Sequence, residues 1–192
     1  MDKKFNHKRL EKLNNPKRLK SIPPNYIWNK INIGQCKTIV DIGAGTGLFS
    51  KAFSEIMGNG TVYALDISDA MVRWMQKNIS NDNNGITPLI MSETKIPLED
   101  ELSDLVLMIT LYHELNSPEI LLAETLRILK KGGKICVIDW KKEKMSFGPS
   151  LEIRSSVDEI SSQLEASGFC RIQTDTSLER FNMVWAEKNT DI

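Results

Sequence analysis

Three glycines at alternate positions, Gly43, Gly45 and Gly47, join an apolar run to a helix candidate. The run before them, residues 37–42, is short and β-branched, as in a buried strand, and residues 46–57 have a helical pattern. Glycine destabilises a helix or strand interior by about 0.5–1 kcal/mol relative to alanine, so this cluster indicates a sharp turn or a close approach of backbone to a ligand. The sequence therefore predicts a strand–turn–helix unit here.

The same alternation of strand and helix continues along the chain. Helices are predicted at 68–79, 117–133 and 155–169, each with polar or glycine-rich ends. Alternation at this spacing is typical of a parallel sheet with helices on both faces, where ligands bind at the carboxyl ends of the strands. The further strands are predicted at 61–66, 86–91, 103–110, 134–139, 170–176 and 181–188.

Composition excludes several classes of protein. The 192 residues include 41% hydrophobic side chains, and 25 Lys and Arg balance 25 Asp and Glu. Residues 105–112, the longest apolar run, fall far short of the ~20 residues that span a bilayer. The basic start of the chain lacks the apolar segment of a secretory signal, so a cytoplasmic location is expected. Three separated cysteines favour neither disulfides nor a metal site, and the four tryptophans are not interleaved with basic residues in the way that would indicate a nucleic-acid surface.

Acidic residues at the strand ends narrow the kind of ligand. The nicotinamide fingerprint is G-x-G-x-x-G, whereas this chain has G-x-G-x-G with Asp41 two residues before the first glycine. A carboxylate there is unfavourable beside a pyrophosphate and suits a cofactor with a cationic end. Asp66 ends the second strand about 20 residues further on, where a carboxylate can accept hydrogen bonds from ribose hydroxyls. The alternatives are a purely structural glycine turn and a solvated Asp66.

Four segments in order resemble the class I S-adenosylmethionine-dependent methyltransferases, and the likeness covers residues 37–139. The nearest likeness is to small bacterial members related to the quinone-biosynthesis C-methyltransferases. The resemblance implies a Rossmann-like, doubly wound, seven-stranded, mostly parallel sheet whose last strand is antiparallel. It also implies S-adenosylmethionine as cofactor and S-adenosylhomocysteine as product. The segments are VDIGAGTG (40–47), IPL (96–98), LYHEL (111–115) and LRILKKGGKICVID (126–139), the last with Lys131 where the family has proline.

The resemblance also implies a cofactor site. Main chain of the glycine turn would lie against the methionine part, with Asp41 near its ammonium group, and Asp66 would bind the ribose. Relatives carry an aspartate at the adenine edge where this chain has Ser92, and Glu93 is expected to replace it. Ile67 and Met71 would flank the adenine, and the two residues after the fourth strand would line the methionine side. The full set is Asp41, Gly43, Ala44, Gly45, Asp66, Ile67, Met71, Ser92, Glu93, Thr110 and Leu111.

His113 is the candidate catalytic residue. Methyl transfer from a sulfonium is an in-line displacement, which requires alignment and exclusion of water but no covalent nucleophile. A general base is needed only if the attacking atom arrives protonated, and His113 in LYHEL is the best-placed group. The alternative is a structural His113, hydrogen-bonded to Glu114 or to main chain. Arg154 is expected in solvent, with an acidic substrate as its alternative partner.

Residues 1–35 precede the predicted methyltransferase domain, residues 36–192, and are expected to form a helical arm. Apolar residues recur through this basic segment, so we expect it to pack as a lid over cofactor and acceptor. The predicted function is methyl transfer to a small molecule that the sequence does not identify. One alternative is a non-catalytic, S-adenosylmethionine-binding regulatory protein. A nicotinamide-dependent oxidoreductase is less favoured, because the Y-x-x-x-K match at Tyr26 and Lys30 precedes the glycine turn instead of following it.

Overall fold

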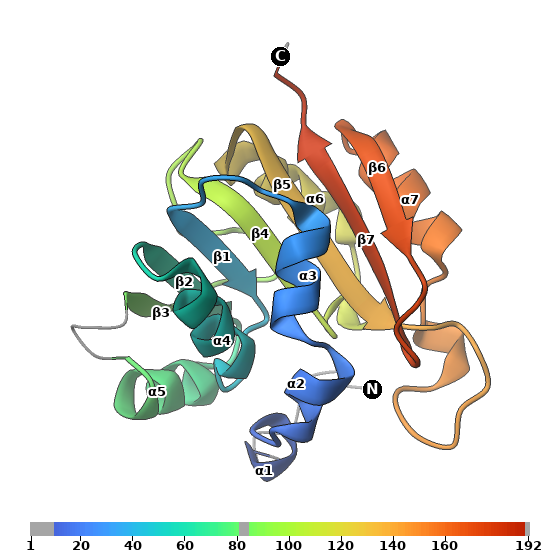
Figure 1. The fold of residues 1–192 in the computed structure, drawn as a ribbon, viewed down its shortest axis with the longest axis horizontal. Coiled ribbons are helices and arrows are strands. Elements are labelled where there is room, and N and C mark those ends of the chain that lie inside the picture. The colour runs from blue at the N-terminus through green and yellow to red at the C-terminus, as the bar shows by residue number, and fades with distance from the viewer. Residues whose placement is uncertain (1–9, 81–84, 191–192) are drawn as a thin grey trace.

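The computed structural model describes residues 10–80 and 85–190, and these include a seven-stranded sheet in the order β3-β2-β1-β4-β5-β7-β6 (Figure 1). Strand β7 is antiparallel to both of its neighbours, and every other strand pair is parallel. The predicted mostly parallel sheet with an antiparallel last strand is thus confirmed. The strands are β1 (Thr38–Ile42), β2 (Thr61–Asp66), β3 (Ile86–Ile90), β4 (Ser103–Ile109), β5 (Leu129–Trp140), β6 (Phe169–Asp175) and β7 (Phe181–Lys188).

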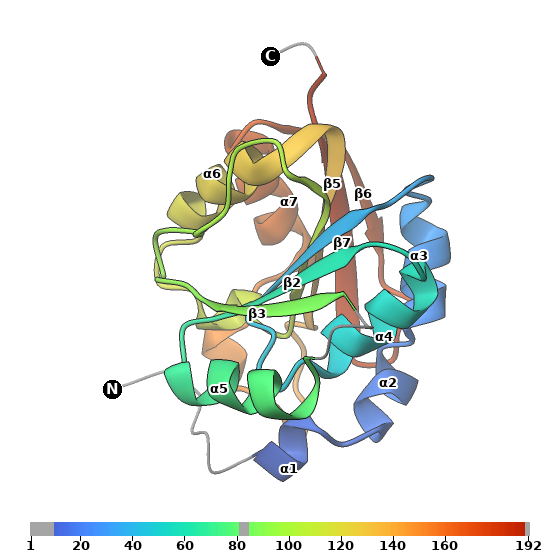
Figure 2. The ribbon, with the colours of Figure 1, turned by 90° about the vertical axis from the view of Figure 1, so that its left-hand side faces the viewer.

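Helices cover both faces of the sheet (Figure 2). On one face lie α3, α4 and α5, and on the other α6 and α7. Short helices α1 and α2 lie near the carboxyl ends of the strands (Figure 1). The helices are α1 (Leu10–Leu13), α2 (Lys17–Ser21), α3 (Pro24–Ile31), α4 (Leu48–Met57), α5 (Asp69–Asn78), α6 (Pro118–Ile128) and α7 (Val157–Ala166), with short 3-10 helices η2 (Tyr112–Glu114) and η3 (Leu151–Ile153).

Strand β4 shows why its sequence is apolar almost throughout. Leu105 and Leu107 face the layer that contains α4, whereas Val106 and Met108 face the layer that contains α6, and all four side chains are fully buried. A strand with helices on both sides needs apolar residues at every position, not at alternate ones. Each such side chain stabilises the fold by about 1.5–3 kcal/mol relative to exposure.

One predicted boundary is wrong. The helix expected over 117–133 ends at Ile128, and β5 begins at Leu129, five residues before the predicted strand. Leu129 pairs with Ser103, but the next pair joins Lys134 to Leu105, so residues 130–133 form a bulge. Leu129 is buried as the first residue of β5, and the same position would also be buried if α6 continued. Hydrophobic periodicity alone therefore does not separate a helix from a strand at this residue.

The arm that precedes β1 is built of two parts. Ile27 and Ile31 of α3 are buried in the same core as the strands, so α3 belongs to the helix layer of the sheet. Helices α1 and α2 lie outside that layer. The division at residue 35 stays a prediction, as does the covering role of the arm, and its residues 1–9 lie outside the described residues. Among the described helices, none has the length and apolar character needed to cross a bilayer.

Candidate active site

The glycine turn between β1 and α4 adopts the conformation that only glycine accepts easily. Gly43 and Gly47 have φ of 71° and 72°, in the left-handed region, and Gly47 begins α4 as its N-cap. A β-carbon on Gly43 would lie 2.8 Å from Cδ1 of Leu111, which follows β4. The predicted sharp turn is confirmed, and it brings main chain from β1 against the end of β4.

Asp66 holds the turn from the neighbouring strand. Its side chain is largely buried at the end of β2, where Oδ2 accepts from the Gly45 N–H at 2.8 Å and Oδ1 accepts from the Ser68 N–H at 2.8 Å. Burial raises the pKa of this carboxyl group, and hydrogen bonds from the backbone of Ser68, Gly45 and Ile67 oppose the shift. A carboxylate has about four lone-pair positions, so Asp66 keeps acceptor capacity for a ligand beside these backbone contacts. The alternative of a merely solvated strand-end acid is wrong.

Asp41 is a second buried carboxyl group, at the end of β1. Only 2% of the residue is exposed, and Oδ2 accepts a hydrogen bond from the Ser50 hydroxyl at 2.6 Å. Burial raises its pKa to about 6, whereas the Ser50 hydroxyl and the charge of Arg18 oppose that shift. Asp41 therefore has a charge that a neighbouring cation would stabilise.

Arg18 is the residue that the sequence reasoning missed. It comes from α2, and its guanidinium donates to Thr110 Oγ1 at 2.8 Å and to the Leu13 carbonyl at 3.1 Å. The guanidinium also lies over the Phe49 ring, with its carbon 5.1 Å from the ring centre. Burial lowers the pKa of Arg18, and Asp41 opposes the shift. No sequence signal separates Arg18 from the other basic residues of the arm.

His113 is held by a carboxylate from another strand. Its Nδ1 lies 2.8 Å from Oδ1 of Asp139, and its backbone N–H donates to Oδ2 of Asp139 at 3.1 Å. Nε2 lies 3.7 Å from Oε1 of Glu114, whose pKa is raised by burial. Since a carboxylate accepts and does not donate, the Asp139 contact places the ring proton on Nδ1 and leaves a lone pair on Nε2.

The other predicted cofactor residues lie around the same strand ends. Ile67, just after β2, is 41% exposed, whereas Met71 is buried in the first turn of α5. Ser92 and Glu93 are exposed beyond β3, and Glu93 accepts a hydrogen bond from Asn116 at 3.5 Å. The structure thus brings the predicted residues to one end of the sheet, and their individual roles stay predictions.

Thr110 and Thr46 are the two unusual polar residues at this end. Thr110 has φ of 54°, which costs a residue with a branched β-carbon about 1–3 kcal/mol and is typical of functional sites. Thr46, in the glycine turn, is 1% exposed, and its hydroxyl has no hydrogen-bond partner among the described residues. An unpaired buried hydroxyl points to a missing partner.

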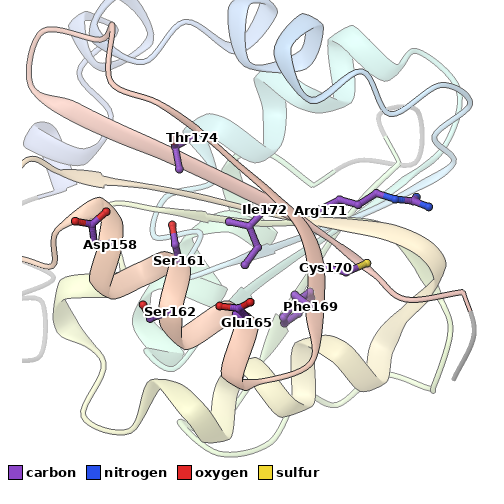
Figure 3. Close-up of a pocket in the computed structure, with 9 residues that line it drawn as sticks. All are labelled: Asp158, Ser161, Ser162, Glu165, Phe169, Cys170, Arg171, Ile172 and Thr174. Atoms are coloured by element: carbon purple, nitrogen blue, oxygen red, sulfur yellow. The ribbon is translucent and has the colours of Figure 1, made fainter.

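A surface hollow lies away from these residues. It has a volume of about 710 Å³ and lies between α7 and β6, with Asp158, Glu165 and Arg171 among its lining residues (Figure 3). None of the predicted site residues lines it. Its position at the edge of the sheet, away from β1, β2 and β4, gives it no part in the site.

A doubly wound sheet with this strand order, a glycine turn after β1 and an acidic residue ending β2 define the class I methyltransferases, whose cofactor is S-adenosylmethionine. Residues 40–137 match the family described as Methyltransferase domain, and the chain belongs to that family. The predicted resemblance is confirmed. Metal binding is not part of this assignment, and the described residues contain no group of His, Cys, Asp or Glu arranged to hold a metal ion.

Individual relatives agree with the family match. The ubiquinone/menaquinone biosynthesis C-methyltransferase UbiE of Cupriavidus taiwanensis is 32% identical over 123 residues, which are 60% of this chain and 50% of that protein. The Bordetella avium protein of the same name is 29% identical over 133 residues, 66% of this chain and 52% of that one. This chain therefore spans about half the length of the curated relatives it matches.

Solved structures extend the likeness over nearly the whole chain. A SAM dependent methyltransferase from Aquifex aeolicus has a TM-score of 0.88 and 30% identity, and the match covers 96% of this chain and 99% of that one. Human N-acetylserotonin methyltransferase in complex with SAM has a TM-score of 0.76 at 19% identity, covering 95% of this chain and 56% of that one, and shows the shared fold.

Proposed function

We propose that this chain transfers a methyl group from S-adenosylmethionine to a small-molecule acceptor. The observation that carries the proposal is the group of Asp41, Asp66 and Arg18 around the glycine turn at the carboxyl ends of the strands, where both aspartates are buried and Arg18 is half-buried. Membership of the methyltransferase domain family supports it. The likeness to the quinone-biosynthesis enzymes supports phenolic and quinol acceptors as the first to test.

The residues present fit the cofactor. The charged methionine end carries an ammonium and a carboxylate, which Asp41 and Arg18 would bind respectively, since no carboxylate among the described residues lies within ion-pair distance of Arg18. Free lone pairs on Asp66 suit the ribose hydroxyls, and the bare Gly43 lets main chain approach the ligand. The unpaired Thr46 hydroxyl is a further donor at the turn.

In the reaction, the chain's residues align the groups and move one proton. When bound, S-adenosylmethionine supplies a methyl group on a sulfonium, which an acceptor lone pair displaces as the carbon–sulfur bond breaks and its electron pair stays on sulfur. Nε2 of His113 takes the proton that the acceptor loses, and Asp139 holds the ring with its other nitrogen protonated. Glu114, 3.7 Å from Nε2, stabilises the protonated ring.

Calorimetry with S-adenosylhomocysteine tests the cofactor site. The wild-type chain should bind it and should not bind reduced nicotinamide cofactor. Asp66→Ala should lower the affinity about 10–100-fold, because hydrogen bonds to a charged group contribute about 1.5–3 kcal/mol. Asp69→Ala is the matched control, since Asp69 is exposed and pairs with Arg73 in the next turn. Unchanged affinity in Asp66→Ala would refute this placement of the ribose.

Turnover with a panel of phenols and quinols separates an enzyme from a regulatory protein. Binding of S-adenosylhomocysteine with no turnover across the panel would favour the non-catalytic alternative.

The oxidoreductase alternative loses its remaining support in the structure. Tyr26 donates to Asp175 at 2.6 Å and Lys30 pairs with the same carboxylate at 2.7 Å, so both residues fix α3 to the end of β6. The cytoplasmic location and the absence of a nucleic-acid partner stay predictions.

A further inference from the structure

A second, smaller hollow lies at the same end of the sheet as the glycine turn. It has a volume of about 370 Å³ and is lined by Lys20 and Ser21 of α2 and by residues 177–181. These residues connect β6 to β7, and β6 runs parallel to β1, so its carboxyl end lies on the side where ligands bind in such sheets. None of the residues assigned to the cofactor lines this hollow.

Helix α2 borders both the hollow and the cofactor residues. Arg18 of this helix donates to Thr110 at the end of β4, whereas Lys20 lines the hollow. Strand β5 separates β4 from β7, and Trp140 at its end pairs with Phe181 at the start of β7. Neighbouring strands are about 4.8 Å apart, so the end of β4 and the start of β7 are roughly 10 Å apart. That is the length of a small elongated molecule.

Aromatic side chains lie between these two points, with Phe181 buried in the core and Trp140 half-buried against it. Trp140 and Phe181 have ring centres 4.6 Å apart, and Phe147 lies edge-on to Trp140 at 6.0 Å. Phe147 is 45% exposed, which is unusual for a large apolar side chain beside other aromatic rings. Arg154 holds this loop in place through carbonyls of residues 141–149. Aromatic rings at fixed positions favour a flat, apolar ligand segment.

Cationic groups lie at the far end of this surface. Lys20 is exposed, and the guanidinium carbon of Arg180 lies 4.4 Å from the centre of the Phe147 ring. The Arg180 Nε is 3.3 Å from a carboxylate oxygen of Glu179, but the Glu179 side chain is 83% exposed and its charge is well screened. The hollow therefore carries two cations and one weakly coupled acid, a set that favours an anion.

We infer that this hollow binds the anionic end of the methyl acceptor, and that the acceptor is an elongated aromatic carboxylate. Its reacting atom lies near His113, its flat part lies along the exposed parts of Trp140 and Phe147, and its carboxylate lies between Lys20 and Arg180. This inference rests on the proposed function, because it names the acceptor class for the same site. A guanidinium and an ammonium on two separate segments would also fix the direction in which the acceptor enters.

The test compares one acid with its neutral amide. 4-Hydroxycinnamate and 4-hydroxycinnamamide have the same shape, and each is titrated into the protein with and without saturating S-adenosylhomocysteine. The wild-type chain should bind the acid at least tenfold more tightly than the amide. In Lys20→Met/Arg180→Met the acid should lose at least tenfold in affinity and the amide should not change. Lys17→Met is the matched control, an exposed lysine of the same helix that does not line the hollow.

Several results would overturn the inference. These are equal affinity for acid and amide, an equal loss in Lys17→Met and Lys20→Met, or no binding of the acid to wild type. S-Adenosylhomocysteine affinity reports separately on the proposed function and on the folding of each variant. If wild type binds no S-adenosylhomocysteine, the proposed function fails. The acid and amide titrations without S-adenosylhomocysteine still decide whether the hollow binds an anion. Should the double variant not fold, Lys20→Met alone gives the answer, because Lys20 is exposed.

Discussion

Asp41 is a buried carboxyl group whose charge depends on what lies beside it. With its pKa raised to about 6 by burial, it is charged near neutral pH and mostly neutral below pH 6. An ammonium group binds the charged form only, so the affinity for S-adenosylhomocysteine should fall as the pH drops through about 6. The limit is about tenfold per pH unit. Calorimetry between about pH 7.5 and 5 measures it, and a constant affinity would contradict the role of Asp41.

Asp41→Asn serves as the control for this pH dependence. The variant should lose the steep part of the dependence and keep only a smaller contribution from Asp66, whose pKa is also raised.

The pH dependence of the free energy of unfolding tests the raised pKa of Asp41 independently of any ligand. Because burial raises the folded pKa above its unfolded value, the folded state binds more protons, and charging Asp41 destabilises the fold. The free energy of unfolding should therefore fall from about pH 4 to 6 in wild type more than in Asp41→Asn.

His113→Gln tests the base directly. The variant should lower turnover with a true acceptor by about 10²–10⁴ while cofactor affinity stays the same. Asp139→Asn should lower turnover as well, because an amide can hold the ring in the wrong tautomer. The chain has only two histidines, so ¹⁵N spectra of the ring nitrogens report the tautomer directly. Loss of folding, or an unchanged rate, would favour a structural His113.

Individual residues differ in how far sequence reveals them. Gly43, Gly45 and Asp66 were predictable because their neighbours in sequence fix a strand, a turn and the next strand end. Arg18 was not, because its role depends on contacts between α2 and β4 that no local pattern encodes. Arg154 was wrongly expected in solvent or at a substrate. It is 4% exposed, and it donates to main chain alone among the described residues.

At the scale of elements, the sheet followed from the sequence more closely than the helix ends did. All seven strands were predicted, and the reason is clearest for the central strands, where burial on both faces leaves few alternatives for an apolar run. The junction of α6 and β5 was missed because its register depends on pairing between Leu129 and Ser103, which are distant in sequence. The sequence of the loop after β5 has no helical or strand periodicity. Its shape comes from a single side chain.

That side chain is Arg154, and its removal should loosen the whole loop. Its guanidinium donates to the carbonyls of Lys141, Glu143 and Pro149 at 3.1, 2.8 and 2.6 Å, and to that of Phe147 at 3.3 Å. Arg154→Met leaves these carbonyls without a charged donor, so the free energy of unfolding should fall by about 2–4 kcal/mol. Urea unfolding measures it, and limited proteolysis should cut the loop first.

The matched control for this element is Arg73→Met. Arg73 is an exposed arginine that pairs with Asp69 one turn away in α5, and its loss should cost about 0.5 kcal/mol or less. Equal effects of the two substitutions would show that the loop does not depend on Arg154. A resistant loop in Arg154→Met would show the same.

On the scale of the whole molecule, the arm is fastened at two places by different chemistry. Helix α3 is held by burial of Ile27 and Ile31 and by the Asp175 contacts of Tyr26 and Lys30. Helix α2 is held by Leu19, which packs against the core, and by Arg18, which lies among the predicted cofactor residues. The contacts of α3 stabilise the fold, and the Arg18 contacts would connect the arm to the proposed ligand. The contacts of α2 can therefore be removed while those of α3 stay in place.

Deleting residues 1–20 does this. The truncated chain keeps Ile22 and α3, so it should fold, but it loses Arg18 and the segment that we expect to cover the strand ends. Affinity for S-adenosylhomocysteine should fall about 10–100-fold, the worth of a charged hydrogen bond. Methyl transfer should fall further, because water reaches the open site. Deleting residues 1–9, which leaves Arg18 in place, is the control, and Arg18→Met should reproduce the loss of affinity. Full activity after the longer deletion, or a strongly salt-dependent affinity of the intact chain for RNA, would instead make the arm a recruiting segment.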